Sequence, residues 1–478
     1  MTIPRQHVPK TRTGIAGFDA ITEGGLPSDR ATVIYGTTGT GKTVFSLQSI
    51  ANAVQGGAPG VYLSFSESIA EIRENGRSFG LDLAGLETNG RLVLDSVHLD
   101  PEELAAAGGL APDSVFVRLE QAVERIGATL VVIDAINVLS QTIANTATSR
   151  AEIRRLLDAL KRRGVTTIIT VEVSKAATFR SEEFLADCVV QLRTEMVKGI
   201  ATRRLRVVKY RGSDHRLNAY PFVITDKGVV VTPIIDDALD MPSSSERISL
   251  GIPGLDKMLR GGVFRGDTLF ISGSAGSGKT SVTVSAAVAS CLRDERCLFV
   301  GMEEPRAQIV RNMGAIGLDL TKWTERGLLR MIPPLRSVEG LEDHLVFILD
   351  QIEEFRPELV VIDPLTPLMA LGEPEDVRET IIRLLSLIKA RGATVACTLL
   401  AREENLEEQN TPFASFVDDI ILLRNIEEGD ERARSVTVLK ARGTPHSTRV
   451  RSFGFSSRGL FVGEPVDPES GGGDGHKV

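Results

Sequence analysis

The sequence carries the same phosphate-binding pattern twice, and this repeat limits the possible folds more than any other feature. GTTGTGKT runs from Gly36 to Thr43 and GSAGSGKT from Gly273 to Thr280, and both satisfy G-x-x-x-x-G-K-[ST] in full. An apolar run precedes each loop, ATVIYG or DTLFISG, and a helix-compatible run follows it. Strand, glycine loop and helix in this order are typical of a P-loop, whose backbone N–H groups surround phosphate oxygens at a helix N-terminus.

Short runs rich in Val and Ile recur in both halves of the chain. They read GVYLSFSE and CLFVGMEE, then ATLVVIDA and ELVVIDPL, then VTTIITVE and ATVACTLL. Because these runs lack polar alternation, they fit strands that are buried on both faces of a parallel sheet. Segments with apolar residues at helical spacing lie between them. The sequence therefore predicts an α/β fold with two tandem P-loop NTPase domains, each a mostly parallel central sheet flanked by helices.

The domain boundaries follow from the repeat and from breaks in the pattern. Each half opens on a leader of the form G-I-x-G-[FL]-D followed by a glycine pair, and IIDDALDMPSSSER interrupts the pattern between the halves. We assign residues 1–240 to the first domain and 241–465 to the second. Residues 466–478 are rich in Gly and polar residues and are expected to form a flexible tail.

Composition excludes several classes of protein. A net charge of −8 with one Trp and four Tyr argues against nucleic acid as a partner. The four cysteines form no CxxC pair and no Cys/His set with zinc spacing. We find neither a signal peptide nor an apolar run long enough to span a membrane, so we expect no membrane partner and a cytoplasmic location.

Each loop supplies the groups that a triphosphate requires. Lys42 and Lys279 should neutralise the β and γ phosphates, and the hydroxyls of Thr43 and Thr280 should ligate Mg²⁺. ATP and Mg²⁺ are therefore the predicted cofactors. The other predicted loop contacts are Gly36, Thr37, Thr38, Gly39, Thr40, Gly41, Gly273, Ser274, Ala275, Gly276, Ser277 and Gly278.

Two carboxylates end matching strands. Asp134 and Asp363 each close the run LVVID, at the carboxyl end of a buried strand, where α/β sheets bind ligands. We expect both to support Mg²⁺ in the Walker B role. The alternative is that each is a turn residue or a helix cap.

The second half also contains an adjacent pair of glutamates. Glu303 and Glu304 could orient and deprotonate a water or a hydroxyl for attack on the γ-phosphate, and Glu303 is a further candidate Mg²⁺ ligand. In the first half Ser66 replaces the first glutamate and only Glu67 is kept. The alternative is that these are charges at a helix N-terminus, favoured by the helix dipole.

A third repeated motif is K-x-R-G-x-x-H. Its charged residues are Lys209 with Arg211 and Lys440 with Arg442, followed by a histidine in each half. In a strand, residues two apart project to the same face, so each pair could point at one anion. A solvated strand edge is the alternative.

Together these motifs resemble the KaiC family, the two-domain RecA-like ATPases and autokinases of cyanobacterial circadian clocks. The resemblance covers about residues 10 to 465 and includes EEPRAQIVRN and DDIILLRN. It implies a RecA-like fold for each domain and homohexameric rings with ATP held between neighbouring subunits. It also implies that the lysine and arginine of each K-x-R pair act on the γ-phosphate bound by the adjacent chain.

The resemblance assigns roles to further residues. Glu303 and Glu304 match the catalytic glutamate pair, so Ser66 leaves hydrolysis in the first domain in doubt. The two autokinase acceptors fall on Ala414 and Ser415, so only Ser415 is left as a phosphoacceptor, with Glu303 as the general base; the alternative is that Ser415 is a small loop residue. The resemblance also places nucleotide contacts at Ser78, Ser213, His215, Thr225, Asp226, Arg434, Thr444 and His446.

We therefore expect an ATP hydrolase and serine/threonine autokinase that regulates signalling or circadian-type behaviour through a nucleotide-dependent ring. The first site would maintain assembly and the second would transfer the phosphoryl group. KaiB-like or response-regulator proteins are candidate partners, whereas the tail does not resemble the segment that meets KaiA. The alternatives are a nucleotide-sensing scaffold with little turnover and a RecA-like ATPase that acts on DNA.

Overall fold

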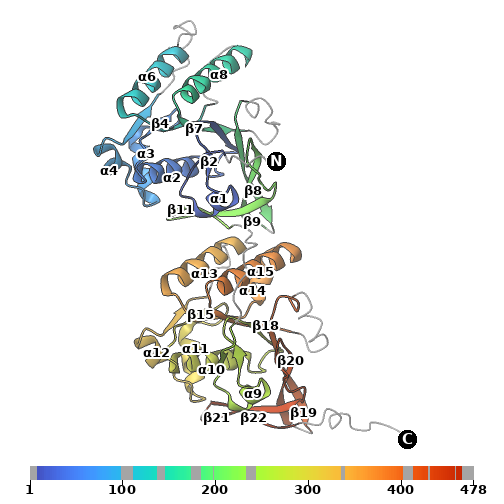
Figure 1. The fold of residues 1–478 in the computed structure, drawn as a ribbon. Helices are drawn as coiled ribbons and strands as arrows, with labels where there is room; N and C mark the ends of the chain where they lie inside the picture. The colour runs from blue at the N-terminus through green and yellow to red at the C-terminus, as the bar shows by residue number, and fades with distance from the viewer. Residues whose placement is uncertain are drawn as a thin grey trace. The chain divides into compact units, whose positions relative to one another are not determined.

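The computed structural model divides the chain into two compact units, Met1–Ile234 and Ile235–Val478, and each is described by itself. Figure 1 shows that both units have the same design, a central sheet with helices on its two faces. The predicted boundary after residue 240 and the predicted tail after residue 465 fall outside the described part of the chain. No helix in that part is long and apolar enough to cross a membrane. The described residues are 8–97, 111–136, 146–173, 185–197, 199–232, 244–334, 340–401, 413–428, 431–457 and 459–465.

The first unit is built on a nine-stranded sheet. Its strands are β3 (Ala31–Gly36), β4 (Gly60–Ser64), β5 (Leu92–Ser96), β6 (Leu130–Asp134), β7 (Thr166–Glu172), β8 (Cys188–Val197), β9 (Ile200–Tyr210), β10 (Ala219–Thr225) and β11 (Gly228–Val231). The spatial order is β11-β10-β9-β8-β3-β7-β6-β4-β5. Neighbours from β8 to β5 are parallel, and β9, β10 and β11 extend the sheet in antiparallel pairs.

The second unit repeats this topology. Its strands are β14 (Thr268–Gly273), β15 (Cys297–Gly301), β16 (Leu329–Ile332), β17 (Leu359–Asp363), β18 (Thr394–Leu400), β19 (Asp419–Glu428), β20 (Glu431–Ala441), β21 (Arg451–Ser456) and β22 (Gly459–Pro465). Their order is β16-β15-β17-β18-β14-β19-β20-β21-β22, with the antiparallel strands again at one side. The prediction of two mostly parallel sheets is confirmed.

Helices and two short strand pairs complete the units. The first unit has β1 (Lys10–Thr11), β2 (Leu26–Pro27), α1 (Ala16–Ile21), α2 (Lys42–Gln55), α3 (Ile69–Ser78), α4 (Leu83–Thr88), α6 (Ala111–Ile126) and α8 (Thr146–Arg162). The second has β12 (Arg247–Ile248), β13 (Val263–Phe264), α9 (Pro253–Met258), α10 (Lys279–Leu292), α11 (Arg306–Gly314), α12 (Thr321–Glu325), α13 (Leu341–Phe355), α14 (Thr366–Met369) and α15 (Pro374–Ala390).

Alternate residues of β3 face two separate apolar cores, which explains why the strand sequence lacks polar alternation. Ile34 shares one core with Phe45 of α2. Val33 lies in the other, together with Leu119 of α6 and Leu160 of α8. Figure 1 shows α2 on one side of this sheet and α6 and α8 on the other. The strand that leads into the first P-loop is thus fixed on both faces.

The doubled leader has a structural explanation. The Asp19 carboxylate accepts hydrogen bonds from the backbone N–H groups of Thr13 and Gly14, and the carboxylate of Asp256 accepts one from the Leu250 N–H. These bonds fix the entry into α1 and α9. In α9, a Cβ added to Gly254 would lie only 2.7 Å from the Cβ of Val462 in β22. The leader glycine therefore lets the helix lie against the last strand of its sheet.

We predict that Gly254→Ala lowers the stability of the second unit by about 1–3 kcal/mol, the usual cost of overpacking a tight contact. Gly314→Ala in α11 is the matched control, because a Cβ there would meet no described atom within 4 Å. In a helix, Ala is favoured over Gly by about 0.5–1 kcal/mol, so the control should be neutral or stabilising. The only tryptophan of the chain, Trp323, is buried in the second unit, and its fluorescence reports the urea midpoint of that unit. Equal midpoints for the two variants would contradict the packing role.

Candidate functional site

In both P-loops the lysine side chain donates hydrogen bonds to backbone carbonyls of its own loop. The Nζ atom of Lys42 donates to the carbonyl oxygens of Gly36 and Thr37, at 3.0 and 2.9 Å. Lys279 makes the same two bonds, to Gly273 at 2.9 Å and to Ser274 at 2.8 Å. Burial lowers the pKa of both ammonium groups, and nearby carboxylates oppose this effect. Each cation is held at the carboxyl end of a strand, where it has lost part of its hydration.

The shape of the loops fits a phosphate chain. Gly41 and Gly278, which directly precede α2 and α10, have φ values of 98° and 101°, a backbone conformation that L side chains rarely adopt. At Gly39 and Gly276 an added Cβ would meet no described atom within 4 Å, so one side of each loop is open. The residues present therefore leave room for phosphate oxygens in front of the helix N-terminus.

Sequence analysis missed two side chains that contact the loops. Thr38 donates a hydrogen bond to Glu172, which ends β7 in register with Gly36. Asn425 of β19 donates to the hydroxyl of Ser274 at 3.0 Å. Both lie on strands next to the P-loop strand, so only the strand order brings them to the site.

The two LVVID aspartates are buried, Asp134 at 4% exposure and Asp363 at 7%. One strand separates each of them from the P-loop strand, β7 in the first unit and β18 in the second. That intervening strand supplies a threonine donor in both units, Thr170 to Asp134 and Thr398 to Asp363.

Each aspartate has further contacts. Tyr62 donates its hydroxyl to Asp134 Oδ2 at 2.6 Å. Asp363 also interacts with Thr280 of the P-loop. Burial raises the pKa of Asp363, and the two threonine hydrogen bonds and Lys279 oppose this rise. The described residues form no group of three His, Cys, Asp or Glu that could hold a metal ion. A Mg²⁺ ion would find a threonine hydroxyl and one or two carboxylates here, besides phosphate oxygens and water, a donor set that Mg²⁺ commonly uses.

The glutamates lie in the turn after β15 and β4. Glu303 is exposed and Glu304 half-buried, and Glu303 is near enough to Lys279 to help raise the pKa of that lysine. In the first unit Ser66 is exposed, and Glu67 accepts a hydrogen bond from Asn75 of α3 at 3.2 Å. Burial raises the pKa of Glu67. The unit with two glutamates thus presents a carboxylate near its loop lysine, and the other unit ties its glutamate to a helix.

The K-x-R pairs lie far from the P-loops of their own units. Lys440 is opposite Ile420, which is in turn opposite Phe270, three residues before the end of β14 at Gly273. At about 3.3 Å per residue this places the lysine about 10 Å short of the loop along the strands, and it is also two strands away. In the first unit Lys209 has the same register relative to β3.

Instead, each pair contacts the segment that precedes β8 or β19. Lys209 donates to the Ala186 carbonyl at 2.7 Å, and Lys440 donates to the carbonyls of Ala414 and Val417. Arg442 donates to the carbonyl of Ser415 at 2.6 Å, and Ser415 itself is exposed. The predicted phosphoacceptor and the predicted anion-binding pair therefore lie together.

An aspartate that sequence analysis missed anchors each of these segments. Asp187 lies 3.5 Å from Lys161 of α8 and 3.9 Å from Arg211. Asp418 lies 2.6 Å from Lys389 of α15 and 3.4 Å from Arg442. Asp187 and Asp418 stand at the same distance in sequence before their K-x-R pairs, and this spacing could have identified them. Their ion pairs with Lys161 and Lys389, however, depend on where the helix lies in the fold.

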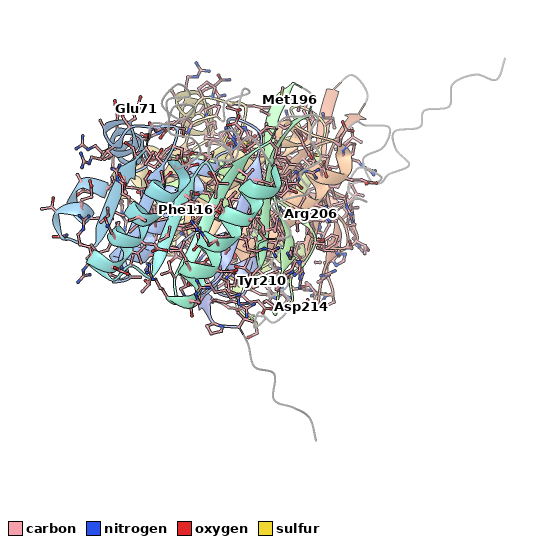
Figure 2. All side chains as sticks on the ribbon, turned by 90° about the horizontal axis from the view of Figure 1, so that it is seen from above. Glu71, Phe116, Met196, Arg206, Tyr210 and Asp214 are labelled. Atoms are coloured by element: carbon pink, nitrogen blue, oxygen red, sulfur yellow. The ribbon has the colours of Figure 1, made fainter. Side chains whose placement is uncertain are left out.

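The first-unit residues implied by the resemblance form two groups. Ser78 ends α3, Thr225 ends β10 and Asp226 lies in the turn that follows, next to Ile224, which faces Gly41 of the P-loop. Ser213 and His215 follow β9, beside the K-x-R pair. The His215 ring lies 6.4 Å from that of Tyr210, the last residue of β9, and Figure 2 labels Tyr210 and Asp214 in the same region.

The second-unit residues divide in the same way. Arg434 donates to the Gly276 carbonyl at 3.1 Å and lies over the ring of Phe455, so it reaches the P-loop of its own unit. Thr444 and His446 follow the K-x-R pair and contact each other, the His446 ring nitrogen lying 3.2 Å from the Thr444 carbonyl. Arg203 stands at the same spacing from Lys209 as Arg434 from Lys440.

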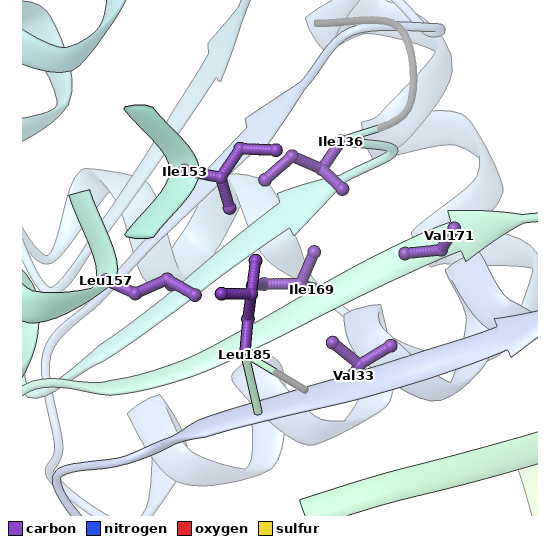
Figure 3. A pocket seen from close by; sticks show the side chains of 7 residues that line it. All are labelled: Val33, Ile136, Ile153, Leu157, Ile169, Val171 and Leu185. Carbon is purple, nitrogen blue, oxygen red and sulfur yellow. The ribbon is translucent and has the colours of Figure 1, made fainter. Parts of the chain in front are cut away.

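One pocket of the first unit lies on the α8 side of the sheet (Figure 3). Its lining is wholly apolar, and Val33, Ile153 and Leu157 belong to the core on that face rather than to the core that contains α2. It offers no polar group to phosphate, so it is separate from the nucleotide site.

Comparisons with known proteins agree with this geometry. The family model described as "ATPase: KaiC" matches residues 11–235 and 248–467. Circadian clock protein KaiC2 of Synechocystis sp. is 39% identical over 467 residues, which cover 95% of this chain and 82% of that protein. Circadian clock protein KaiC3 of the same organism is 33% identical, with 96% and 92% covered. The circadian clock oscillator protein KaiC of Synechococcus elongatus is 34% identical, with 95% and 89% covered. The chain therefore belongs to the KaiC family of ATPases.

Proposed function

We propose that the chain binds Mg-ATP at both P-loops, hydrolyses it, and phosphorylates itself on Ser415. The observation that carries the proposal is the separation of each K-x-R pair from the P-loop of its own unit, together with the contact of Lys440 and Arg442 with the Ser415 segment. Cations placed there are suited to serve a nucleotide on a neighbouring copy. Ring assembly, with ATP at the subunit boundaries, would bring loop and cations together.

The second unit holds the groups for phosphoryl transfer. Lys279 and the loop N–H groups would bind the phosphates, and Thr280, oriented by Asp363, would hold Mg²⁺, which neutralises the charge that develops on the phosphate oxygens. Glu303 would accept the proton of a water or of the Ser415 hydroxyl. The oxygen then attacks the γ-phosphorus as the bond to the β-phosphate oxygen breaks, and Lys440 and Arg442 from the neighbour would stabilise the transition state.

The first unit fits a slower role. Ser66 stands at the position of Glu303, and Glu67 is bound to Asn75. We propose that this site mainly keeps ATP at the subunit boundary and so maintains the ring. A nucleotide-sensing scaffold with little turnover is the second candidate function, and the loss of this glutamate favours it for the first unit.

The biological role is proposed from the relatives, which are named circadian clock proteins. We propose that this chain forms a homohexamer in the cytoplasm, where its nucleotide state is sensed by KaiB-like or response-regulator proteins. KaiA is not proposed as a partner, and the net charge of −8 gives no support for a DNA-acting ATPase.

Mixing two inactive variants tests action between copies. Lys279→Ala should lose ATP at the second site, and Lys440→Ala/Arg442→Ala should lower turnover there by about 10³-fold, the low end for a trans-acting arginine. Mixed rings should recover about a quarter of the second-site activity, because random assembly unites an intact loop with an intact pair at one boundary in four. ATP turnover is measured above that of the Glu303→Gln/Glu304→Gln chain. A mixture no more active than its components would show that the pair does not act between copies.

Autophosphorylation is tested by incubating the chain with γ-labelled ATP and mapping the label by peptide mass spectrometry. We expect phosphate on Ser415, none on that segment in Ser415→Ala, and unchanged labelling in Ser447→Ala, a hydroxyl control outside the proposed machinery. Glu303→Gln should slow labelling by about 10²-fold, the low end for loss of a general base. If wild type carries no label on Ser415, the kinase proposal fails and the ATPase proposal stands.

A further inference from the structure

We propose that the hydroxyl of Tyr62 is a positioning group that weakens Mg²⁺ binding at the first P-loop, by engaging the aspartate that should support the metal. This inference rests on the proposed function, in which the first unit holds ATP with slow turnover. It identifies a residue that contributes to the slow turnover. The argument depends on a difference between two otherwise matching sites in one chain.

Both oxygens of Asp134 receive a hydrogen bond from a neighbouring strand. Tyr62 of β4 donates to Oδ2 at 2.6 Å, and Thr170 of β7 donates to Oδ1. Tyr62 has no exposed surface and Asp134 is 4% exposed, so water cannot readily replace either bond. A buried tyrosine hydroxyl needs a partner, and here the partner is the charged group at the end of the Walker B strand.

The second unit provides an internal comparison. Phe299 is opposite Val361 in β17, as Tyr62 is opposite Val132 in β6, and each lies two residues before the aspartate in register. Phenylalanine has no hydroxyl to donate at this position. Asp363 accepts hydrogen bonds from Thr398 and from Thr280, the predicted metal ligand. The two sites thus share the intervening-strand threonine and differ at the matching position of the next strand, a tyrosine that donates to the aspartate in one and a phenylalanine in the other.

The direction of the effect follows from electrostatics. A donor to a carboxylate oxygen draws negative charge toward itself and fixes the group in its direction, so less charge is available to a metal-bound water or to Thr43. Removing a group that contacts a metal ligand from outside typically lowers metal affinity by about 10–100-fold. We expect a change of this size but of opposite sign here, since the hydroxyl competes with the metal for the carboxylate. Because a tyrosine-to-phenylalanine change removes a competing donor, it should tighten Mg²⁺ binding. Ser66 also replaces a glutamate in this unit. Relative to the second unit, the presence of Tyr62 and the presence of Ser66 therefore both favour slow turnover at the first site.

The test uses the full chain carrying Lys279→Ala, so that only the first P-loop binds nucleotide, and compares it with the same chain carrying Tyr62→Phe. The Mg²⁺ concentration for half-maximal binding of a fluorescent ATP analogue is measured at equilibrium, and Mn²⁺ binding by electron paramagnetic resonance is the second readout. We expect half-saturation at about tenfold lower metal in Tyr62→Phe, the low end for an outer-shell group. In a Lys42→Ala chain, Phe299→Tyr should shift the second site in the opposite direction.

Tyr210→Phe is the matched control, because it also removes a buried tyrosine hydroxyl, one that donates to the Gly25 carbonyl at 3.0 Å rather than to Asp134. It should leave the metal requirement unchanged. An unchanged or higher metal requirement in Tyr62→Phe would overturn the inference and leave the hydroxyl as a satisfied core group, while the proposed function would stand. Absence of nucleotide binding in the Lys279→Ala parent would overturn the proposed function of the first unit, and the inference with it.

Discussion

The lysine that closes each P-loop is the interaction on which the rest of the site depends. Lys42 and Lys279 each lie across two carbonyls of their own loop and are partly stripped of water. A desolvated cation next to open backbone N–H groups is matched to an anion, and the polyphosphate of ATP satisfies both. The glycines around it are needed because the chain must turn through a left-handed conformation directly before the helix.

The sheet then separates two kinds of charge. The P-loop lysine, the LVVID aspartate and the glutamate turn lie together at the carboxyl end of the parallel strands. The antiparallel strands place the K-x-R pair toward the opposite end. Under the proposed function, one copy of the chain therefore holds part of a nucleotide site at each end of these strands. Closing a ring of copies is the simple way to complete both, and it would couple the nucleotide at one boundary to the Ser415 segment beside the pair.

Local signals in the sequence were sufficient for the fold class and for placing the motifs that depend on neighbours in sequence at strand ends and helix starts. The P-loops, the LVVID strands and the parallel core are of this kind, because backbone geometry and burial leave a periodic pattern. The antiparallel extension of each sheet was not predicted, although the K-x-R strand belongs to it. Residues whose role depends on which strands or helices become neighbours were missed: Tyr62, Glu172, Asp187, Asp418 and Asn425.

The most direct test is to count the adenine nucleotides that each chain retains in the presence of Mg²⁺. The count is made for wild type, for Lys42→Ala, for Lys279→Ala and for the variant that carries both changes. Because the ATPase family matches the chain in two separate ranges, we expect two nucleotides per wild-type chain. Lys42→Ala and Lys279→Ala should each retain one, and the double variant none. A wild-type chain that retains no nucleotide, or a double variant that retains as much as wild type, would contradict the account.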